Sequence, residues 1–141
     1  MTELIIVGAG GMARKILHKL RQINEQEERY VVLGCLDDHP IEDAKVPYLG
    51  SITDHDIKEG VRYVMGVSDP KTKEQLAKIL KDKGAQFETL IDPRADLGDD
   101  VSFGEGCIIF TPHIIDCGAS FGDFVTVMGS TISFDASIGD F

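Results

Sequence analysis

The sequence has no tryptophan, only three cysteines among 141 residues, and few basic side chains. An odd number of cysteines without metal-type spacing does not suit a disulfide framework, so we expect free thiols in a reducing cytoplasm and no metal. Lys and Arg number 14 against 24 Asp and Glu, which gives a net charge of −10. That charge argues against nucleic acid or an anionic membrane as the main partner, although a helix end can still hold a small anion.

Long apolar stretches are missing as well. No run approaches the ~20 residues of a membrane span. The start of the chain, Met1–Val7, is too short and too acidic for a signal peptide. The hydrophobic fraction of 43% suits a globular core. We therefore expect a folded cytoplasmic protein.

The N-terminal end of the chain favours a strand, a glycine turn and a helix. Leu4–Val7 is a short apolar run typical of a buried parallel strand. The segment directly after it matches the pattern G-x-G-x-x-G/A, and Arg14–Ile23 has apolar residues at helical spacing. Gly8 permits the tight turn, Gly10 leaves room for a phosphate, and Ala13 lets helix and strand pack closely. The turn therefore predicts a phosphate site at the start of the helix, or else only a tight connection.

The rest of the N-terminal part also alternates strands and helices. Further strands are predicted at Tyr30–Leu36, Arg62–Val67 and Gln86–Ile91, and a second helix is predicted at Pro70–Lys83 with Ser68 or Asp69 as N-cap. This alternation indicates an α/β, Rossmann-like parallel sheet over residues 1–92. Asp37 and Asp38 follow the second strand, where a carboxylate can accept hydrogen bonds from a ribose or a base. They can equally form an ordinary polar turn before Pro40.

A six-residue period begins after Pro93. Large apolar residues stand at every sixth position, and a column of smaller ones stands four residues after each. The large residues are Leu97, Phe103, Ile109, Ile115, Phe121 and Val127, and the column is Val101, Cys107, His113, Ala119 and Val125. This period is the hexapeptide signature of a parallel β-helix, in which three hexapeptides make one coil. We predict a second domain over residues 93–141, incomplete at its C-terminus, with a register slip between Val127 and Ile132.

A glycine-turn domain followed by hexapeptides resembles the NeuD/PglD-type sugar O- and N-acetyltransferases over essentially the whole chain. The matching stretches are Ile5–Gly11, Gly34–Asp38, Val46–Ser51, Val64–Asp69, Thr89–Ala95 and Phe121–Phe124. The resemblance implies an α/β Rossmann-like domain that binds the nucleotide of a nucleotide-sugar, followed by a left-handed parallel β-helix. It implies nucleotide-binding residues at Gly8, Gly10, Gly11, Met12, Asp37 and Asp38.

The same resemblance implies an activity in surface glycan synthesis. It implies a homotrimer, formed when the β-helix is complete, with acetyl-CoA as co-substrate between subunits. In the family, a histidine of a late coil takes a proton from the sugar amine or hydroxyl as that atom attacks the thioester, a role that suits imidazole. The family position is Phe134 here, beside Asp135, and Met12 stands where many members have histidine. Family chains also continue beyond this length, so we expect a truncated piece or a member with changed catalytic residues.

Three alternatives remain open at the level of sequence. His113, a histidine in a small-residue column, is a candidate for the missing base, or it is simply accommodated at a corner of the coil. A catalytically inactive module that binds a nucleotide-sugar would explain Phe134 and Met12. A fragment of an NAD-dependent oxidoreductase would explain the glycine turn and Asp37, but this acid lies farther from the glycines than the ~20 residues of the NAD fingerprint. That third alternative also gives no reason for the hexapeptides.

Overall fold

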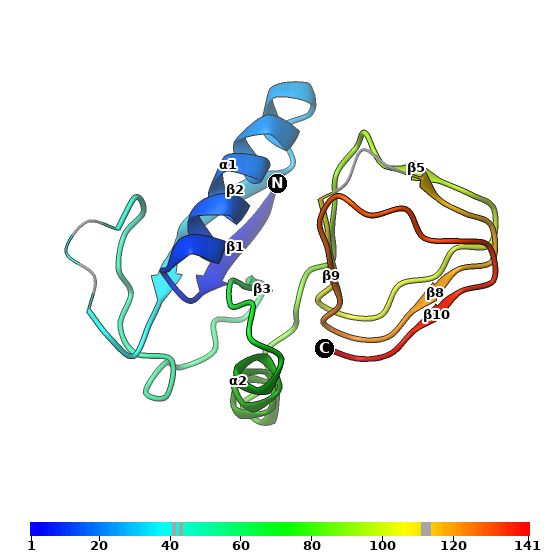
Figure 1. Cartoon of the computed structure of the whole chain (residues 1–141). Helices are drawn as coiled ribbons and strands as arrows, with labels where there is room; N and C mark the ends of the chain where they lie inside the picture. The colour runs from blue at the N-terminus through cyan, green and yellow to red at the C-terminus, as the bar shows by residue number, and fades with distance from the viewer. Residues whose placement is uncertain (41, 43, 111–113) are drawn as a thin grey trace. The chain divides into compact units, whose positions relative to one another are not determined.

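The computed structural model describes residues 1–40, 42, 44–110 and 114–141. Contacts divide the chain into two compact units, Met1–Phe87 and Glu88–Phe141, both drawn in Figure 1. Among the described residues, no helix combines the length and the apolar character that crossing a membrane requires.

The first unit contains a three-stranded parallel sheet in the order β2-β1-β3. The strands are β1 (Thr2–Val7), β2 (Tyr30–Leu36) and β3 (Arg62–Met65), and the helices are α1 (Gly11–Gln26) and α2 (Pro70–Asp82). The last four residues of β1 are completely buried, as expected for the central strand of a parallel sheet covered on both faces. The predicted α/β order of elements up to α2 is confirmed.

The two helices begin differently, because only α2 has a side-chain cap. α1 begins at Gly11, three residues before the predicted start, and its buried side consists of Ala13, Ile16, Leu17, Leu20 and Ile23. α2 has the predicted N-cap: the carboxylate of Asp69 accepts hydrogen bonds from the Thr72 amide at 2.9 Å and from its hydroxyl at 2.8 Å. Pro70 follows as the first helical residue, where its missing N–H costs nothing.

The predicted strand Gln86–Ile91 is wrong as a single element of the first sheet. Phe87 forms a bridge with Tyr63 of β3, whereas β4 (Leu90–Ile91) pairs with β6 (Ile108–Ile109) in the second unit. The reason lies in the six-residue period, because Ile91 precedes Leu97 by six positions and therefore belongs to the same apolar series. β4 is thus already part of the repetitive unit.

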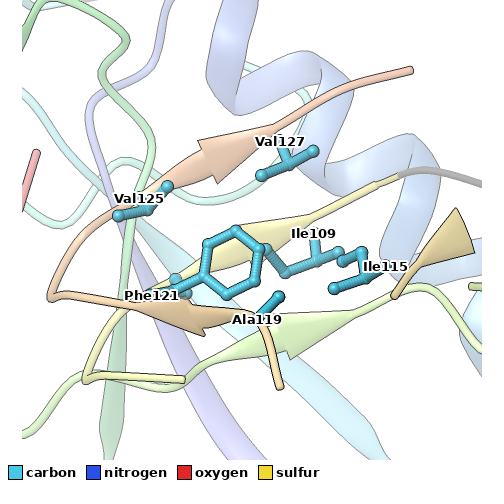
Figure 2. Packing of buried hydrophobic residues seen from close by; sticks show 7 residues of the cluster. Ile109, Ile115, Ala119, Phe121, Val125 and Val127 are labelled. Atoms are coloured by element: carbon cyan, nitrogen blue, oxygen red, sulfur yellow. The ribbon is translucent and has the colours of Figure 1, made fainter. Parts of the chain in front are cut away.

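The second unit winds in successive turns whose short strands pair in parallel, three hexapeptides apart along the chain (Figure 1). Its other strands are β5 (Asp96–Leu97), β7 (Ile114–Ile115), β8 (Ser120–Phe121), β9 (Thr126–Val127) and β10 (Ser137–Ile138). The predicted partners Leu97 and Ile115, and Ile109 and Val127, are observed. Phe103 and Phe121 stack with ring centroids 5.0 Å apart. Leu97 is 39% exposed, whereas the other side chains of these pairs lie in or against the buried interior, whose cluster Figure 2 shows.

The register slip lies where it was predicted. Ile132 bridges Ile115, and β10 pairs with β8 through Ser137 and Ser120, so these partners are one position closer in sequence than those of the preceding turns. The chain between Val127 and Ile132 is one residue shorter than the corresponding part of the preceding turn. The interior apolar series nevertheless continues, because Ile132 and Ile138 pack against the buried cluster.

Replacing Gly104 by alanine is expected to destabilise the second unit by about 1–3 kcal/mol, because overpacking forces backbone shifts. A Cβ at Gly104 would collide with the Gly122 carbonyl oxygen and the Asp123 carboxylate of the next turn. Gly139→Ala is the matched control, since a Cβ there meets nothing within 4 Å. Chemical denaturation measures both variants, and equal stability would contradict this packing.

His55 is a buried histidine whose Nε2 lies 2.9 Å from the Tyr63 hydroxyl. Burial, with Lys58 and Lys83 nearby, lowers the pKa of His55. The unfolded chain therefore binds more protons than the folded one as pH falls through about 6.5, and stability decreases there. His55→Gln should flatten this part of the profile, whereas His18→Gln on the exposed side of α1 should not. Melting temperatures from pH 7.5 to 5.5 provide the measurement.

Candidate functional site

The site begins at the carboxyl end of β1, where the chain turns sharply into α1. Gly8 has a φ of +100°, and a Cβ there would lie only 3.0 Å from the Gly66 carbonyl oxygen and from a methyl group of Val67. Its amide donates to the Leu36 carbonyl at 2.6 Å. Gly10 is the N-cap of α1 and supplies no side-chain hydrogen bond to the first turn. The first amides of the helix therefore lack the side-chain cap that would compete with an anion.

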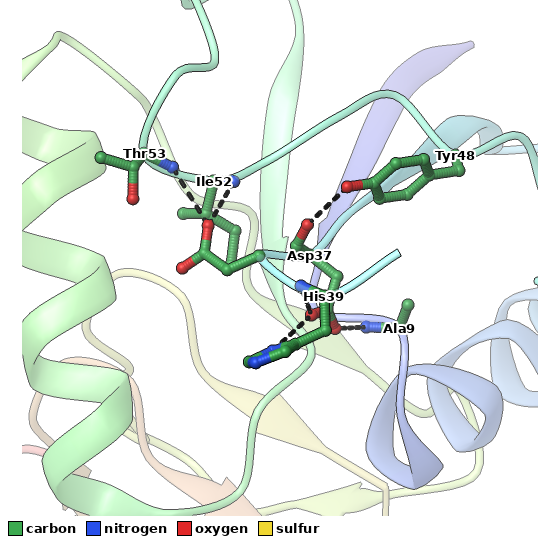
Figure 3. Close-up of polar contacts among 7 residues, drawn as sticks. Ala9, Asp37, His39, Tyr48, Ile52 and Thr53 are labelled. Carbon is green, nitrogen blue, oxygen red and sulfur yellow. Dashed lines mark hydrogen bonds and ion pairs between the residues drawn. The ribbon is translucent and has the colours of Figure 1, made fainter. Parts of the chain in front are cut away.

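Asp37 ties the end of β2 to this turn, as Figure 3 shows. Its Oδ2 accepts a hydrogen bond from the Ala9 amide at 3.0 Å, and its Oδ1 accepts one from the His39 amide at 2.9 Å. The Tyr48 hydroxyl donates to the Asp37 carbonyl at 2.8 Å. The Asp37 carboxylate thus links the end of β2 to the glycine turn that follows β1. The structure therefore brings Asp37 together with the glycines that the sequence analysis selected.

Asp38 has a different environment. Its Oδ1 accepts hydrogen bonds from the amides of Ile52 at 3.0 Å and Thr53 at 3.4 Å (Figure 3). This oxygen therefore stabilises the backbone of the loop that contains these two residues. Met12 is half-buried in the first turn of α1. Both lie in the first unit near the turn, but the hydrogen bond to the glycine turn comes from Asp37.

A segment after Asp38 returns along β2. The Cys35 amide donates to the Pro47 carbonyl and the Leu49 amide donates to the Cys35 carbonyl, each at 2.9 Å. Gly34 permits this approach, because a Cβ there would collide with the Pro47 carbonyl oxygen. The segment is therefore fixed beside β2, and Lys45 belongs to this segment.

A cavity of about 250 Å³ lies between the glycine turn, the first two turns of α1 and this returning segment. It is lined by Ile6, Ala9, Gly10, Gly11, Ala13, Arg14, Leu17, Cys35, Ala44, Lys45 and Val46. Burial, and to a lesser degree the charge of Asp37, raises the pKa of the Cys35 thiol. The thiol therefore stays protonated and acts as part of an apolar wall rather than as a nucleophile.

Arg14 and Lys45 are the charged lining residues among those described, and the sequence did not suggest them as site residues. Arg14 reads as one more surface residue of an amphipathic helix, although its place one turn after the glycines was an available signal. Lys45 lies in a loop, and only the pairing of the returning segment with β2 brings it to the cavity. Among the described residues, neither side chain has a carboxylate within ion-pair distance or a hydrogen-bond partner.

Phe134 and Asp135, which the resemblance places at the family's catalytic position, lie in the second unit. Phe134 is 67% exposed. Asp135 has a φ of +55°, and its amide donates to the Cys117 carbonyl at 2.9 Å. His113 lies outside the described residues. Among the other histidines, His55 is buried against Tyr63, whereas His39 is exposed with Nδ1 3.8 Å from the Asp37 carboxylate. No group of three or more metal-ligating side chains occurs in the ranges that the structure describes.

Comparison with protein families identifies residues 3–80 as a PglD N-terminal domain. This match covers more than half of the chain. The chain belongs to this family. The resemblance to NeuD/PglD-type sugar acetyltransferases is thereby confirmed. No curated protein sequence matches the chain.

Solved structures with the same fold include members of the acetyltransferase class. The acetyltransferase domain of PglB from Neisseria gonorrhoeae has a TM-score of 0.81 and 20% identity, over 99% of this chain and 69% of that one. A mutant of perosamine N-acetyltransferase from Caulobacter crescentus, in complex with CoA and GDP-perosamine, has a TM-score of 0.79 and 21% identity over 99% and 66%. WeeI from Acinetobacter baumannii has a TM-score of 0.74 and 18% identity over 99% and 67%. This PglD-family chain spans about two thirds of their lengths.

Replacing Asp37 by alanine should remove the link between β2 and the glycine turn. A hydrogen bond to a charged group contributes about 1.5–3 kcal/mol, and we expect the free energy of unfolding to fall by about that amount. The Ala9 amide resonance should shift upfield, because it loses its acceptor. Asp54→Ala is the control, since this residue is exposed. An unchanged Ala9 resonance would show that the bond does not form in solution.

Proposed function

We propose that this PglD-family chain belongs to an acetyl-CoA-dependent acetyltransferase that acts on a nucleotide-linked or sialic-type sugar in surface glycan synthesis in the cytoplasm. The observation that carries this proposal is the uncapped glycine turn, held by Asp37 and opening on a cavity with two cationic side chains. A nucleotide-sugar fits that site because its diphosphate is anionic and its nucleoside is partly apolar. The relative from Caulobacter crescentus was crystallised with CoA and GDP-perosamine.

In this proposal residues 1–92 are the nucleotide-sugar domain. The contact residues are Gly8, Gly10, Gly11, Met12, Asp37 and Asp38. The glycines allow the ligand to approach the backbone, and the amides of the first helical turn face its phosphates. The two aspartates border the site at the end of β2, where Asp37 already orients the turn.

Residues 93–141 are proposed to begin a left-handed parallel β-helix. Its parallel pairings, spaced by three hexapeptides, and its interior apolar series support this. Stacked coils bury their interior only against neighbouring coils. In the proposed assembly three such units form a homotrimer, and acetyl-CoA binds between subunits. Arg94 is the single Lys or Arg between Glu88 and Phe141, and it pairs with Asp92 at 2.7 Å. The phosphates of acetyl-CoA would therefore need cations from other parts of the assembly.

The acetyl-transfer step requires a base near the acceptor atom. The sugar amine or hydroxyl attacks the thioester carbonyl, loses its proton to the base, and the CoA thiolate leaves. Phe134 cannot accept a proton, so Asp135, its neighbour in the sequence, and His113 are the candidates that remain in this chain. If none of them serves, the chain acts as an inactive nucleotide-sugar-binding module.

The two functions are separated by measuring acetyl-CoA turnover as thiol release, together with binding of UDP- and CMP-linked sugars by calorimetry. An active enzyme should release thiol only when the acceptor is present. A binding module should bind the nucleotide-sugar without release, and Phe134→His is the variant to test for gained turnover. No binding of any nucleotide-sugar by the folded chain would contradict both. Binding of NAD in their place would support the oxidoreductase alternative.

A further inference from the structure

The cavity beside the glycine turn has two chemically distinct parts. Ile6, Ala13, Leu17 and Cys35 are buried and form an apolar floor. Arg14 and Lys45 are exposed at the rim, and none of the described residues that line the cavity has a carboxylate. In a chain with a net charge of −10, long-range attraction does not favour an anion. Binding of an anion here must therefore depend on these two local charges and on the helix amides.

Arg14 lies in the first turn of α1, where the helix dipole disfavours a positive charge. A Cβ on Gly11 would lie 3.9 Å from Nη2 of Arg14, so the guanidinium folds back over the first turn of α1. The helix dipole makes this end partly positive and disfavours a cation there. Within the part of the chain that the structure describes, no carboxylate pairs with Arg14. An anion bound at the turn would interact favourably with both the partly positive end of the helix and the guanidinium.

Lys45 reaches the cavity from a different element. The backbone pairing of Pro47 and Leu49 with Cys35 fixes the returning segment beside β2, and Lys45 precedes this pairing by two residues. The two cations therefore come from independent elements, one from α1 and one from the segment that follows β2. Each cation can form charge-assisted hydrogen bonds with phosphate oxygens, and a diphosphate offers one phosphate to each of them.

We propose that Arg14 and Lys45 form a cationic clamp that makes this cavity selective for a nucleoside diphosphate over the corresponding monophosphate. This proposal rests on the proposed nucleotide-sugar site and specifies the part of the ligand that the cavity recognises. The volume of about 250 Å³ is smaller than the ~300–1,000 Å³ typical of small-molecule sites. The floor therefore takes part of the nucleoside, the rim takes the diphosphate, and the sugar lies outside.

The test is calorimetric titration of the full chain with GDP, GMP, UDP, UMP and CoA. Wild-type protein should bind at least one diphosphate about tenfold or more tightly than its monophosphate. Arg14→Gln and Lys45→Gln should each weaken diphosphate binding about tenfold while changing monophosphate binding much less. Lys15→Gln is the matched control, because Lys15 is the exposed neighbour of Arg14 on α1 and does not line the cavity.

The outcomes distinguish the clamp from the site that contains it. Diphosphate binding that survives both substitutions, or equal binding of mono- and diphosphates, would overturn the clamp and leave the nucleotide-sugar site standing. Binding of CoA that depends on Arg14 and Lys45, without binding of any nucleoside diphosphate, would overturn the assignment of the ligand. No binding of any of these compounds by folded wild-type protein would overturn both proposals together. Circular dichroism of each variant confirms folding, which we expect to persist because both side chains are exposed.

Discussion

Every strand pairing in the described parts of this chain is parallel, and both units follow from this constraint. Parallel strands cannot be joined by a hairpin, so the chain must travel back before it pairs again. In the first unit α1 provides the return from β1 to β2. In the second unit a full turn of three hexapeptides provides it. The same constraint gathers the segments that follow β1 and β2 at one edge of the sheet, which is where Asp37 meets the glycine turn.

Charge is distributed unevenly between the two units. The first unit contains all the Lys and Arg residues except Arg94, whereas the second contains ten of the acidic residues. The parallel turns stack some of these acids above one another, and backbone amides compensate part of the repulsion: Asp123 accepts from the Glu105 amide at 2.8 Å, and Asp140 accepts from the Asp123 amide at 2.7 Å. The cationic side chains that could contact an anionic ligand therefore lie almost entirely in the first unit, where our proposal places the ligand beside Arg14 and Lys45.

Periodicity predicted what depends on regular spacing. It gave the three strands and two helices of the first unit, the partners of Leu97 and Ile109, and the slip after Val127. Leu90–Ile91 was assigned to the first sheet because it follows Phe87 in the same apolar stretch. Ile91 nevertheless stands six residues before Leu97, and its strand partner lies one full turn further along the chain. The site divides in the same way. The glycines and Asp37 belong to a local pattern, but Lys45 reaches the cavity through long-range pairing with Cys35, which no window of sequence contains.

The central claim is that the glycine turn and the neighbouring cavity bind a nucleoside diphosphate. The most direct measurement is the change in backbone amide resonances of the isotope-labelled chain during titration with GDP and with UDP. The account predicts that the largest changes occur at Ala9, Gly10 and Gly11, with smaller changes at Cys35 and Lys45 as the cavity fills. Changes confined to Glu88–Phe141 would contradict this claim. So would the absence of any change at the highest concentrations of both GDP and UDP.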